Sequence, residues 1–343
     1  MGVSVRELDG SGEAAWDRYV TAAPEGTFFH LAGWRRVIER AFRYHAYYLF
    51  AERDGVITGV LPLVHRKSRL FGDGLVSVPF CVYGGPLASD AESLERLIDH
   101  CLDLRRRLAA DLIEFRSRQP AAVEWPVRGD LYATFRRPLA GDADADLKAI
   151  PRKQRAVVRK GIANGLGCRI DRDADRFYRI YAESVRNLGT PVFSLRYFRI
   201  LVECFGDCCE ILTVEDQGAA LSAVLSFYFR DEVLPYYGGG TPRARLRAAS
   251  DFMYWKLMRH AAGRGARLFD FGRSKFGTGS FDFKKNWGFT PEPLHYQYQM
   301  RPGQAIPDHN PLNPRYRLLI AAWKKLPLPL ANLIGPPIVR GLG

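Results

Sequence analysis

The chain has 343 residues, 47% of them hydrophobic and 13% aromatic, which is long enough for two globular domains and too apolar for a disordered chain. Its formal net charge of +13 favours an anionic partner or surface; nucleic acid, anionic lipid and phosphorylated substrates all fit. None of the six cysteines forms a Cys-x-x-Cys pair, and no Cys/His cluster has the spacing of a zinc site, so we expect no metal. We interpret the cysteines as reduced thiols of a cytoplasmic protein.

The first part of the chain predicts a mixture of helices and strands. Asp54-Gly55, between two apolar runs, is the signature of a tight hairpin turn. On hydrophobic periodicity we expect helices at 16–22, 28–42 and 91–110, and strands at 47–52, 56–65, 112–116 and 132–138.

The second part repeats this order. A run of small and acidic residues at 141–146 marks a boundary, and a basic helix at 147–163 follows it. Beyond it we expect helices at 176–187, 194–204 and 251–262, and strands at 209–214, 220–229, 232–237 and 267–271. Tyr83-Gly84-Gly85 occupies the same place in the first pattern as Tyr237-Gly238-Gly239 in the second. The sequence therefore predicts an α+β protein of two similar domains, 1–146 and 147–303, with mostly antiparallel sheets flanked by helices.

The remaining segment, 304–343, has a different composition. It is rich in proline, its basic residues outnumber its one acidic residue, Asp308, and apolar residues are interleaved with them. A basic, tryptophan-bearing, apolar segment suits an anionic membrane surface, with 306–343 as the contact, and would make the protein peripheral at the inner face of the cell membrane. The same pattern would also let the segment pack on the second domain.

The segment from Tyr236 to Phe289 contains, in order, a strand, a glycine turn, a helix, a strand ending in polar groups and an aromatic-lysine run. Acyl transfer needs such parts, because backbone amides at a helix start bind phosphate and a cation offsets developing charge. Ser250 is the expected N-cap of the helix at 251–262, and Arg247 precedes it, so we predict both as donor-binding residues. The Arg-x-x-Gly-x-Gly/Ala loop that binds coenzyme A in single-domain acetyltransferases is missing.

Two lysines are the candidates for the cation. If 281–285 is a strand, Asp282 and Lys284 share one face and Lys285 points to the other. Lys284 and Asp282 would then form a polar pair in a cleft, or a surface ion pair of little consequence. No covalent nucleophile is required, which agrees with the absence of a Gly-x-Ser-x-Gly motif.

Other polar and aromatic residues are candidates for substrate binding. A tyrosine followed by glycines can hydrogen-bond a substrate that approaches the backbone closely, and an Asp and an Arg at a strand end can hold an amine or a phosphate. Three arginines at helical spacing can clamp a phosphate, although such rows are often solvated. The predicted substrate-binding residues are Tyr236, Tyr237, Gly238, Asp270, Arg273, Tyr83, Arg152, Arg155 and Arg159.

Several motifs in the same order resemble the FemAB family, in particular its exopolysaccharide-associated branch with a BioF2-like acetyltransferase domain. They are 78–86, the basic helix at 152–162, 187–192, 236–239, 270–273, 283–289 and 313–337. The resemblance implies two tandem acetyltransferase-like (GNAT) domains and an N-acyl- or aminoacyltransferase. The lysine that serves the chemistry in the family corresponds most simply to Lys284, with Lys285 as the alternative because the spacing differs.

The resemblance also implies the partners. The acyl donor would be a co-substrate, aminoacyl-tRNA or acyl-CoA, rather than a tightly bound cofactor. The acceptor would be an amine on a nucleotide- or lipid-linked precursor of the cell envelope or of an exopolysaccharide; no DNA partner is expected. Two alternatives stay open: an acyl-CoA-dependent N-acetyltransferase of an amino sugar or lipid-linked glycan, and a non-catalytic GNAT-like scaffold.

Overall fold

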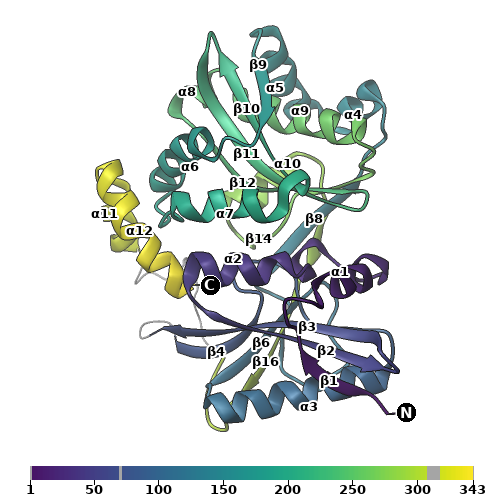
Figure 1. The fold of residues 1–343 in the computed structure, drawn as a ribbon. Helices are drawn as coiled ribbons and strands as arrows, with labels where there is room; N and C mark the ends of the chain where they lie inside the picture. Colours follow the sequence, from purple (N-terminus) through teal and green to yellow (C-terminus); the bar gives the residue numbers. More distant parts are fainter. Residues whose placement is uncertain (1, 69–71, 307–316, 343) are drawn as a thin grey trace. The chain divides into compact units, whose positions relative to one another are not determined.

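The computed structural model describes residues 2–68, 72–306 and 317–342, and it divides into two compact units. Unit 1 consists of 1–131, 293–309 and 340–343, and unit 2 consists of 132–292 and 310–339. Figure 1 shows the elements of both units, coloured along the sequence. Each unit has its own sheet, and each is described separately below.

Unit 1 is built on an eight-stranded sheet. Seven strands follow the order β1-β2-β3-β4-β6-β16-β7, and β5 pairs with β3. Among the described residues of this sheet, β4 and β6 are the strands that pair in parallel, and helix α3 lies between them in the chain. The elements are β1 (Ser4–Glu7), α1 (Glu13–Ala22), η1 (Phe28–His30), α2 (Gly33–Phe42), β2 (His45–Arg53), β3 (Val56–Ser68), β4 (Gly72–Ser77), β5 (Leu87–Ala88), α3 (Ala91–Leu108), β6 (Leu112–Ser117), β7 (Val127–Arg128) and β16 (His295–Met300).

Along each strand, successive side chains point to opposite faces of the sheet, and apolar residues on both faces are buried by helices. Helices α1 and α2 cover one face and α3 covers the other (Figure 1). Leu49, Leu61 and Ile113 are fully buried under α3, together with its own Leu97. The expected turn between β2 and β3 is confirmed: Asp54 and Gly55 have φ angles of 53° and 79°, the left-handed pair that a two-residue hairpin requires.

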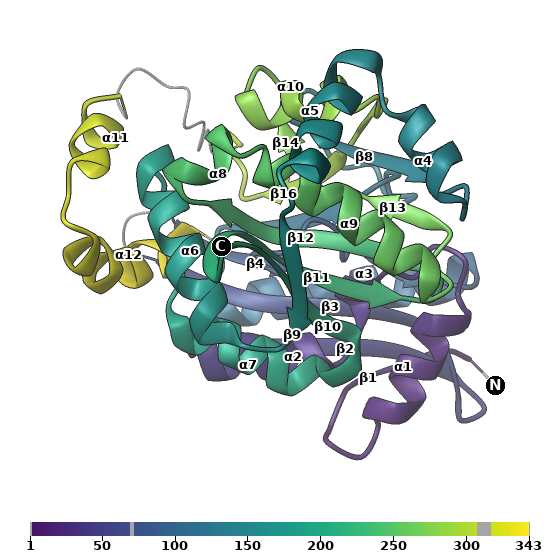
Figure 2. The ribbon, with the colours of Figure 1, turned by 90° about the horizontal axis from the view of Figure 1, so that it is seen from above.

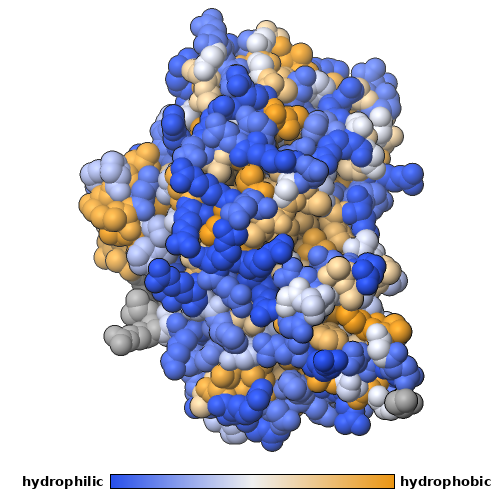
Figure 3. All heavy atoms as spheres, viewed as in Figure 1, coloured by the Kyte–Doolittle hydropathy of each residue, from blue (hydrophilic) through white to orange (hydrophobic). Residues whose placement is uncertain are grey.

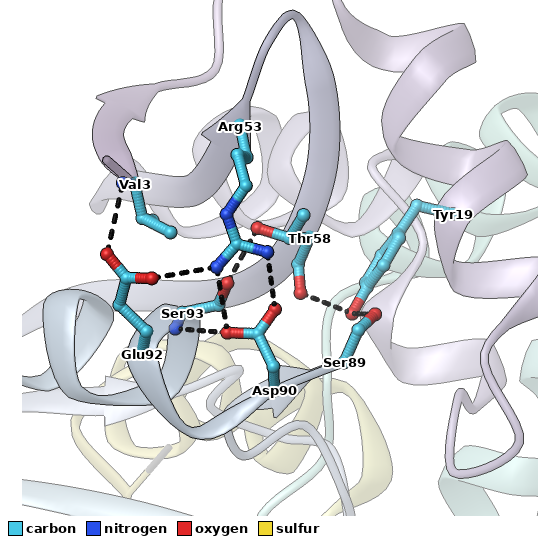
Figure 4. Close-up of polar contacts among 8 residues, drawn as sticks. All are labelled: Val3, Tyr19, Arg53, Thr58, Ser89, Asp90, Glu92 and Ser93. Atoms are coloured by element: carbon cyan, nitrogen blue, oxygen red, sulfur yellow. Dashed lines mark hydrogen bonds and ion pairs between the residues drawn. The ribbon is translucent and has the colours of Figure 1, made fainter. Parts of the chain in front are cut away.

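A polar network fixes the start of α3 (Figure 4). Asp90 caps the helix by accepting from the Ser93 backbone amide at 2.8 Å, and the Arg53 guanidinium of β2 forms ion pairs with Asp90 and Glu92. The Ser93 hydroxyl donates to Thr58 of β3 at 2.7 Å. The network therefore joins the helix to two strands of the sheet on which it packs.

Unit 2 has a second eight-stranded sheet, in the order β14-β8-β13-β12-β11-β10-β9, with β15 paired to β8. Here β12 and β13 are the parallel pair, and α9 lies between them in the chain. The elements are β8 (Tyr132–Pro138), α4 (Ala143–Ala149), α5 (Arg152–Ala163), β9 (Gly167–Asp171), α6 (Ala174–Leu188), α7 (Leu195–Phe205), η2 (Gly206–Cys208), β10 (Cys209–Asp216), β11 (Ala219–Phe229), β12 (Glu232–Gly240), α8 (Pro242–Leu246), α9 (Ala249–Gly263), β13 (Leu268–Asp270), β14 (Ser274–Lys275), α10 (Gly279–Asn286), β15 (Pro291–Pro293), α11 (Arg317–Lys324) and α12 (Leu328–Leu342).

Helices cover both faces of this sheet (Figures 1 and 2), and glycines bring them close to it. A Cβ atom on Gly239 would lie 3.1 Å from the Tyr181 Cα atom of α6. On the other face, a Cβ atom on Gly238 would lie 3.1 Å from the Tyr254 hydroxyl of α9. Successive strand residues point to opposite faces, so these two glycines let α6 and α9 pack closely on opposite sides of β12.

The fold class is confirmed as α+β with two mixed, mostly antiparallel sheets, but several boundaries differ from expectation. The strand at 132–138 belongs to the sheet of unit 2, although we placed the boundary at 146. Strand β16, at 295–300, completes the sheet of unit 1, although we placed it in the second domain. Both strands pair with partners far away in the sequence, and local periodicity carries no signal for such pairing.

Two expected helices are interrupted. The basic helix at 147–163 is divided into α4 and α5 because Pro151 ends the first and begins the second. The helix at 28–42 is a 3-10 turn followed by α2, with Leu31 extended between them. None of the helices in the described part of the chain is long and apolar enough to cross a membrane.

Candidate functional site

The parallel pair of unit 2 is short, and the two strands diverge. The pairing covers only Glu232 with Leu268 and Val233 with Phe269. Strand β13 then ends at Asp270, while β12 continues to Gly240 along its other neighbour, β11. The C-terminal end of β13 and the loop after it, 270–274, thus lie where the sheet opens.

Asp270 anchors this loop. Its side chain is 1% exposed and accepts hydrogen bonds from the Thr134 hydroxyl at 3.1 Å and the Gly272 amide at 2.8 Å. The Arg136 guanidinium lies 3.4 Å from its other carboxylate oxygen and also pairs with Glu232. Asp270 is therefore a buried, paired carboxylate that joins β13 to β8, and it does not reach out to hold a substrate amine as we predicted.

Lys284 extends from α10 into the same loop. The amine is buried and donates to the carbonyl oxygens of Gly272 at 2.8 Å and Arg273 at 3.1 Å. It also lies over the rings of Phe135 and Phe271, at 5.4 and 5.7 Å from their centroids. Lys284 thus holds the backbone of the loop that follows β13.

The surroundings make this amine easy to deprotonate. The pKa of Lys284 is lowered to about 7, mainly by burial; the Asp270 carboxylate opposes this shift, and the charge of Arg273 adds to it. A lysine with a pKa near neutrality can exchange a proton at physiological pH, which an ordinary surface lysine does not do. Buried groups with such pKa values are frequent in catalytic sites.

The condition under which Asp282 and Lys284 would share one face, a strand at 281–285, is not met, and the helix found there separates the two lysines. This segment is helix α10, in which Phe281 and Lys284 are buried, and Trp287, its C-cap, continues the buried side at the same spacing of three residues. Asp282 is two residues from Lys284, hence about 200° around the helix, so it faces solvent and does not pair with that amine. Lys285 is exposed too, with its amine 5.9 Å from the Phe281 ring centroid.

Arg273 is the second cation of the loop. It is half-buried, and its guanidinium lies over the Tyr132 ring, 4.3 Å from the centroid. Sequence reasoning identified Arg273 but missed Tyr132, Thr134, Phe135 and Arg136. All four belong to β8, which we predicted as a strand without a partner; alternating polar and apolar residues at its start were the only signal.

The tyrosines before the glycines have separate environments. The Tyr237 hydroxyl lies 2.8 Å from that of Tyr197 of α7, inside an aromatic cluster, and Tyr236 is half-buried against Phe227. The predicted glycine turn is wrong, because Gly238–Gly240 continue β12. Gly238 makes room for the Tyr254 hydroxyl, whose pKa burial raises to about 12.

The predicted donor-binding residues are placed differently from expectation. Ser250 lies inside the first turn of α9, whose N-cap is Ala248 with a φ of 57° and no side-chain cap. Arg247 forms an ion pair with Asp216 at 2.9 Å and donates to the Asn164 carbonyl at 3.1 Å. The Arg247 side chain therefore ties the start of α9 to α5 and β10.

The basic residues of α5 lie on its solvent side. Val158 and Gly161 face α9, while Arg152 and Arg159 are exposed and Arg155 is half-buried. A Cβ atom on Gly161 would lie 2.7 Å from the Phe252 Cβ atom, which shows how closely α5 and α9 approach. The three arginines thus lie at helical spacing on the solvent side of α5.

Tyr83 lies in a different place, a cavity of about 160 Å³ in unit 1. The cavity forms where β4 and β6 end, between the loops that follow them and the turn before α2. It is lined by Glu25, Thr27, His30, Tyr83, Gly84, Gly85, Pro86, Leu87, Arg116, Ser117, Arg118, Gln119, Pro120 and Ala121.

The polar side chains around this cavity form hydrogen bonds and ion pairs with neighbouring groups. The buried His30 ring contacts the Thr27 hydroxyl at 2.8 Å and the Gly85 carbonyl at 2.9 Å. Arg116 is paired with Glu114 at 2.7 Å, and Arg118 lies over the Tyr83 ring while pairing with Glu25 at 3.1 Å. Glu25 is 69% exposed, so an incoming anion can replace it on Arg118 at little cost.

Comparison with known proteins agrees with this geometry. Residues 148–285 match the family model described as an acetyltransferase (GNAT) domain. The solved structure of FemX superposes with a TM-score of 0.66 at 15% identity, over 85% of this chain and 96% of FemX. The chain has the tandem GNAT-like fold of FemX. The predicted likeness to the FemAB family is thus confirmed at the level of the fold.

Two further structures share this tandem GNAT-like fold. A tandem GNAT protein from the clavulanic acid biosynthesis pathway has a TM-score of 0.55 at 13% identity, over 88% of this chain and all of that protein. The C-terminal domain of a protein described as a lysylphosphatidylglycerol synthetase from Agrobacterium fabrum has a TM-score of 0.57 at 12% identity, over 85% and 92% of the two chains. No curated protein matches the sequence.

Proposed function

We propose that this tandem GNAT-like protein is an N-acyltransferase that joins an acyl or aminoacyl group to an amine of a cell-envelope or exopolysaccharide precursor. The observation that carries the proposal is the buried Lys284 amine at the open end of the β12–β13 pair, inside the segment that matches the acetyltransferase domain. The names of the similar structures, FemX and a tandem GNAT protein among them, support the same reaction class.

In this proposal Lys284 supplies positive charge during transfer. Attack of a neutral amine on the acyl carbonyl forms the C–N bond and produces an oxyanion and a positively charged nitrogen, and a cation in a site shielded from water stabilises the oxyanion more than a solvated cation would. Collapse of the oxyanion then breaks the bond to the oxygen or sulfur of the donor, and the proton lost by the attacking nitrogen goes to that leaving group. Approach of the negative charge raises the pKa of Lys284 from about 7, which favours the protonated amine during the transfer. The proposed catalytic group is therefore Lys284, and Lys285 and Asp282 have no part in the step.

The donor distinguishes two forms of the function. Aminoacyl-tRNA is the donor that we favour, because exposed Arg152 and Arg159 and half-buried Arg155 lie on one surface of α5, and Arg243 and Arg245 on the neighbouring α8 are also exposed. Acyl-CoA is the second candidate, supported by the family model of residues 148–285. Against it stand the missing coenzyme A loop and the engagement of Arg247 with Asp216.

A transfer assay with a panel of donors tests the proposal. The purified protein would be incubated with acetyl-CoA, longer acyl-CoAs or charged tRNA, together with UDP-amino sugars or lipid-linked amino sugars, and amide products would be detected by mass spectrometry. We expect product with charged tRNA and a steep loss of activity with rising salt. Product with acyl-CoA alone would establish the second candidate, and no product with any pair would contradict catalysis and favour the scaffold.

A further inference from the structure

The two helices at the end of the chain, as far as Val339, belong to unit 2, and small residues bring them close to it. Ala331, Gly335 and Val339, at intervals of four, are buried on one side of α12, and Gly341 is buried near its end. A Cβ atom on Gly335 would lie only 2.9 Å from the Val192 backbone nitrogen. In α11, the Lys324 carbonyl accepts from Arg186 at 3.2 Å, so the segment packs on unit 2 as one of our two alternatives required.

The rest of the surface of these helices is apolar and exposed. Leu318 and Leu319 of α11 are 83% and 66% exposed, and Leu333 of α12 is 72% exposed. Leu330, Ile334 and Ile338 continue this face of α12 at 42%, 37% and 36%. Figure 3 shows the hydrophobic side chains gathered over α11 and α12. Such a concentration is unusual for a surface that meets only water.

The exposed apolar face carries positive charge and no negative charge. From 317 to 342 the sequence contains Arg317, Lys324, Lys325 and Arg340 but neither aspartate nor glutamate. Lys324 and Lys325 are exposed at the junction of the two helices, beside the apolar face. Apolar side chains together with lysines are the composition of helices that lie in the interface of an anionic bilayer, where each lysine adds to the attraction.

The positive charge of this face distinguishes between two possible partners, a second copy of the chain and an anionic lipid surface. A second copy would bring the same basic residues against one another and carries its own formal charge of +13, so like charges oppose that pairing. An anionic lipid surface complements both the leucines and the lysines. Neither described helix can cross the bilayer, so the segment would lie along the surface.

We propose that the exposed face of α11 and α12, formed by Leu318, Leu319, Leu330, Leu333, Ile334 and Ile338 with Lys324 and Lys325, binds the surface of an anionic lipid bilayer. The leucines and isoleucines enter the boundary between headgroups and acyl chains, and the two lysines contact lipid phosphates. Because the small-residue face holds the helices on unit 2, binding needs no unfolding of the segment. This interaction is independent of the proposed acyl transfer.

Vesicle flotation with the full-length protein tests the proposal. Vesicles of phosphatidylcholine with about 30% phosphatidylglycerol should retain the protein, pure phosphatidylcholine should retain much less, and salt should weaken the binding. The double variant Leu318→Gln/Leu333→Gln should bind the anionic vesicles at least about tenfold more weakly, because it removes two deeply inserted side chains. Lys324→Gln/Lys325→Gln should lower binding and its salt dependence.

Leu246→Gln is the matched control. Leu246 is 74% exposed but lies on α8, so its replacement should leave vesicle binding unchanged. All of the substituted side chains are exposed, and equal melting temperatures would exclude a folding defect. Equal retention of the wild type and Leu318→Gln/Leu333→Gln on anionic vesicles would overturn the proposal. A dimer that these two substitutions dissociate, without vesicle binding by the wild type, would identify a second copy as the occupant and also overturn it.

Discussion

Units 1 and 2 use one sheet topology for two different kinds of site. In each, a helix connects two strands that pair in parallel, β4 with β6 across α3 and β12 with β13 across α9. At the end of the pair, unit 1 has a cavity lined by Arg116 and Arg118, whose charges are matched by glutamates. Unit 2 has instead a buried amine with a lowered pKa. The shared topology thus puts a candidate site at the end of the parallel pair in each unit, and the side chains at the strand ends determine the chemistry of that site.

In each unit the second strand of the parallel pair has another neighbour in the sheet, and this neighbour comes from a different part of the chain in the two units. Strand β16, which pairs with β6 in unit 1, contributes Tyr296, whose ring lies under the Arg116 guanidinium. Strand β8, which pairs with β13 in unit 2, contributes Thr134 and Arg136, both of which contact Asp270. This strand therefore contributes to the polar environment at the end of the parallel pair in each unit. In unit 1 its Gln297 also holds the loop after β6 through hydrogen bonds with Ala121 and Val123.

The largest expected effect is on catalysis. Replacing Lys284 by methionine should lower kcat by about 100-fold or more, the usual effect of removing a preorganised group that stabilises an oxyanion. The exposed Lys285→Met should retain nearly normal kcat. Steady-state kinetics with the donor found in the transfer assay would measure both. Equal losses in the two variants would contradict the assignment, provided that circular dichroism shows both to be folded.

The next effect concerns the packing of α5 on α9 in unit 2. Gly161→Ala should destabilise the protein by about 1–3 kcal/mol, because the new methyl group would meet Phe252 and the Ala248 carbonyl. Gly263→Ala, at the end of α9 with nothing within 4 Å, should be neutral or stabilising by up to about 1 kcal/mol. Urea unfolding of the two variants measures the difference; a stabilising Gly161→Ala would show that the helices are not closely packed.

A third prediction follows from the lowered pKa of Lys284. In the folded state this pKa is about 7, and in the unfolded state it is near 10.5, so between these values the unfolded chain binds a proton that the folded chain does not. The contribution of Lys284 to stability therefore increases as pH rises from 7 toward 10.5, by up to about 1.4 kcal/mol per pH unit.

Urea unfolding of the wild type and Lys284→Met at pH 7 and pH 9 isolates this contribution from those of other groups. We expect the stability of the wild type relative to the variant to be greater at pH 9. A difference between the two proteins that is the same at both pH values would be inconsistent with a buried, neutral amine.

The smallest effect is expected in unit 1. If its cavity binds a phosphate-bearing substrate, Arg118→Gln should raise the KM for that substrate by about three- to tenfold, because it removes one charged hydrogen bond, and should leave kcat unchanged. Arg96→Gln, on the exposed side of α3, is the control. A lowered kcat in Arg118→Gln would mean that unit 1 takes part in the chemistry as well as in binding.

Much of the fold could be predicted from local sequence. The Asp54-Gly55 turn, the strand at 132–138 and the succession of two similar patterns are all present, because backbone preference and periodicity act over a few residues. The pairing of β8 and β16 depends on partners more than a hundred residues away, so it escaped prediction. That pairing supplies Thr134 and Arg136, which is why the setting of Asp270 was also missed.

The candidate site was predicted in part. Lys284 was identified together with Lys285, and only the helical form of 279–286 tells them apart by burying one of them. The strand prediction failed because two residues at alternate positions fit a strand as well as a helix over so short a run. Ser250 and Arg247 were predicted from a capping signal, but α9 begins two residues earlier than expected and Arg247 is paired with Asp216.

The pKa of the Lys284 amine tests the central claim most directly. Protein labelled with 13C at the lysine Cε would be titrated by NMR, and the Lys284 signal would be assigned by its absence in Lys284→Met. We predict a midpoint near pH 7 that moves upward when a negatively charged substrate binds. A midpoint near 10.5, the ordinary value for lysine, would show that Lys284 is a solvated cation and would contradict the proposed site.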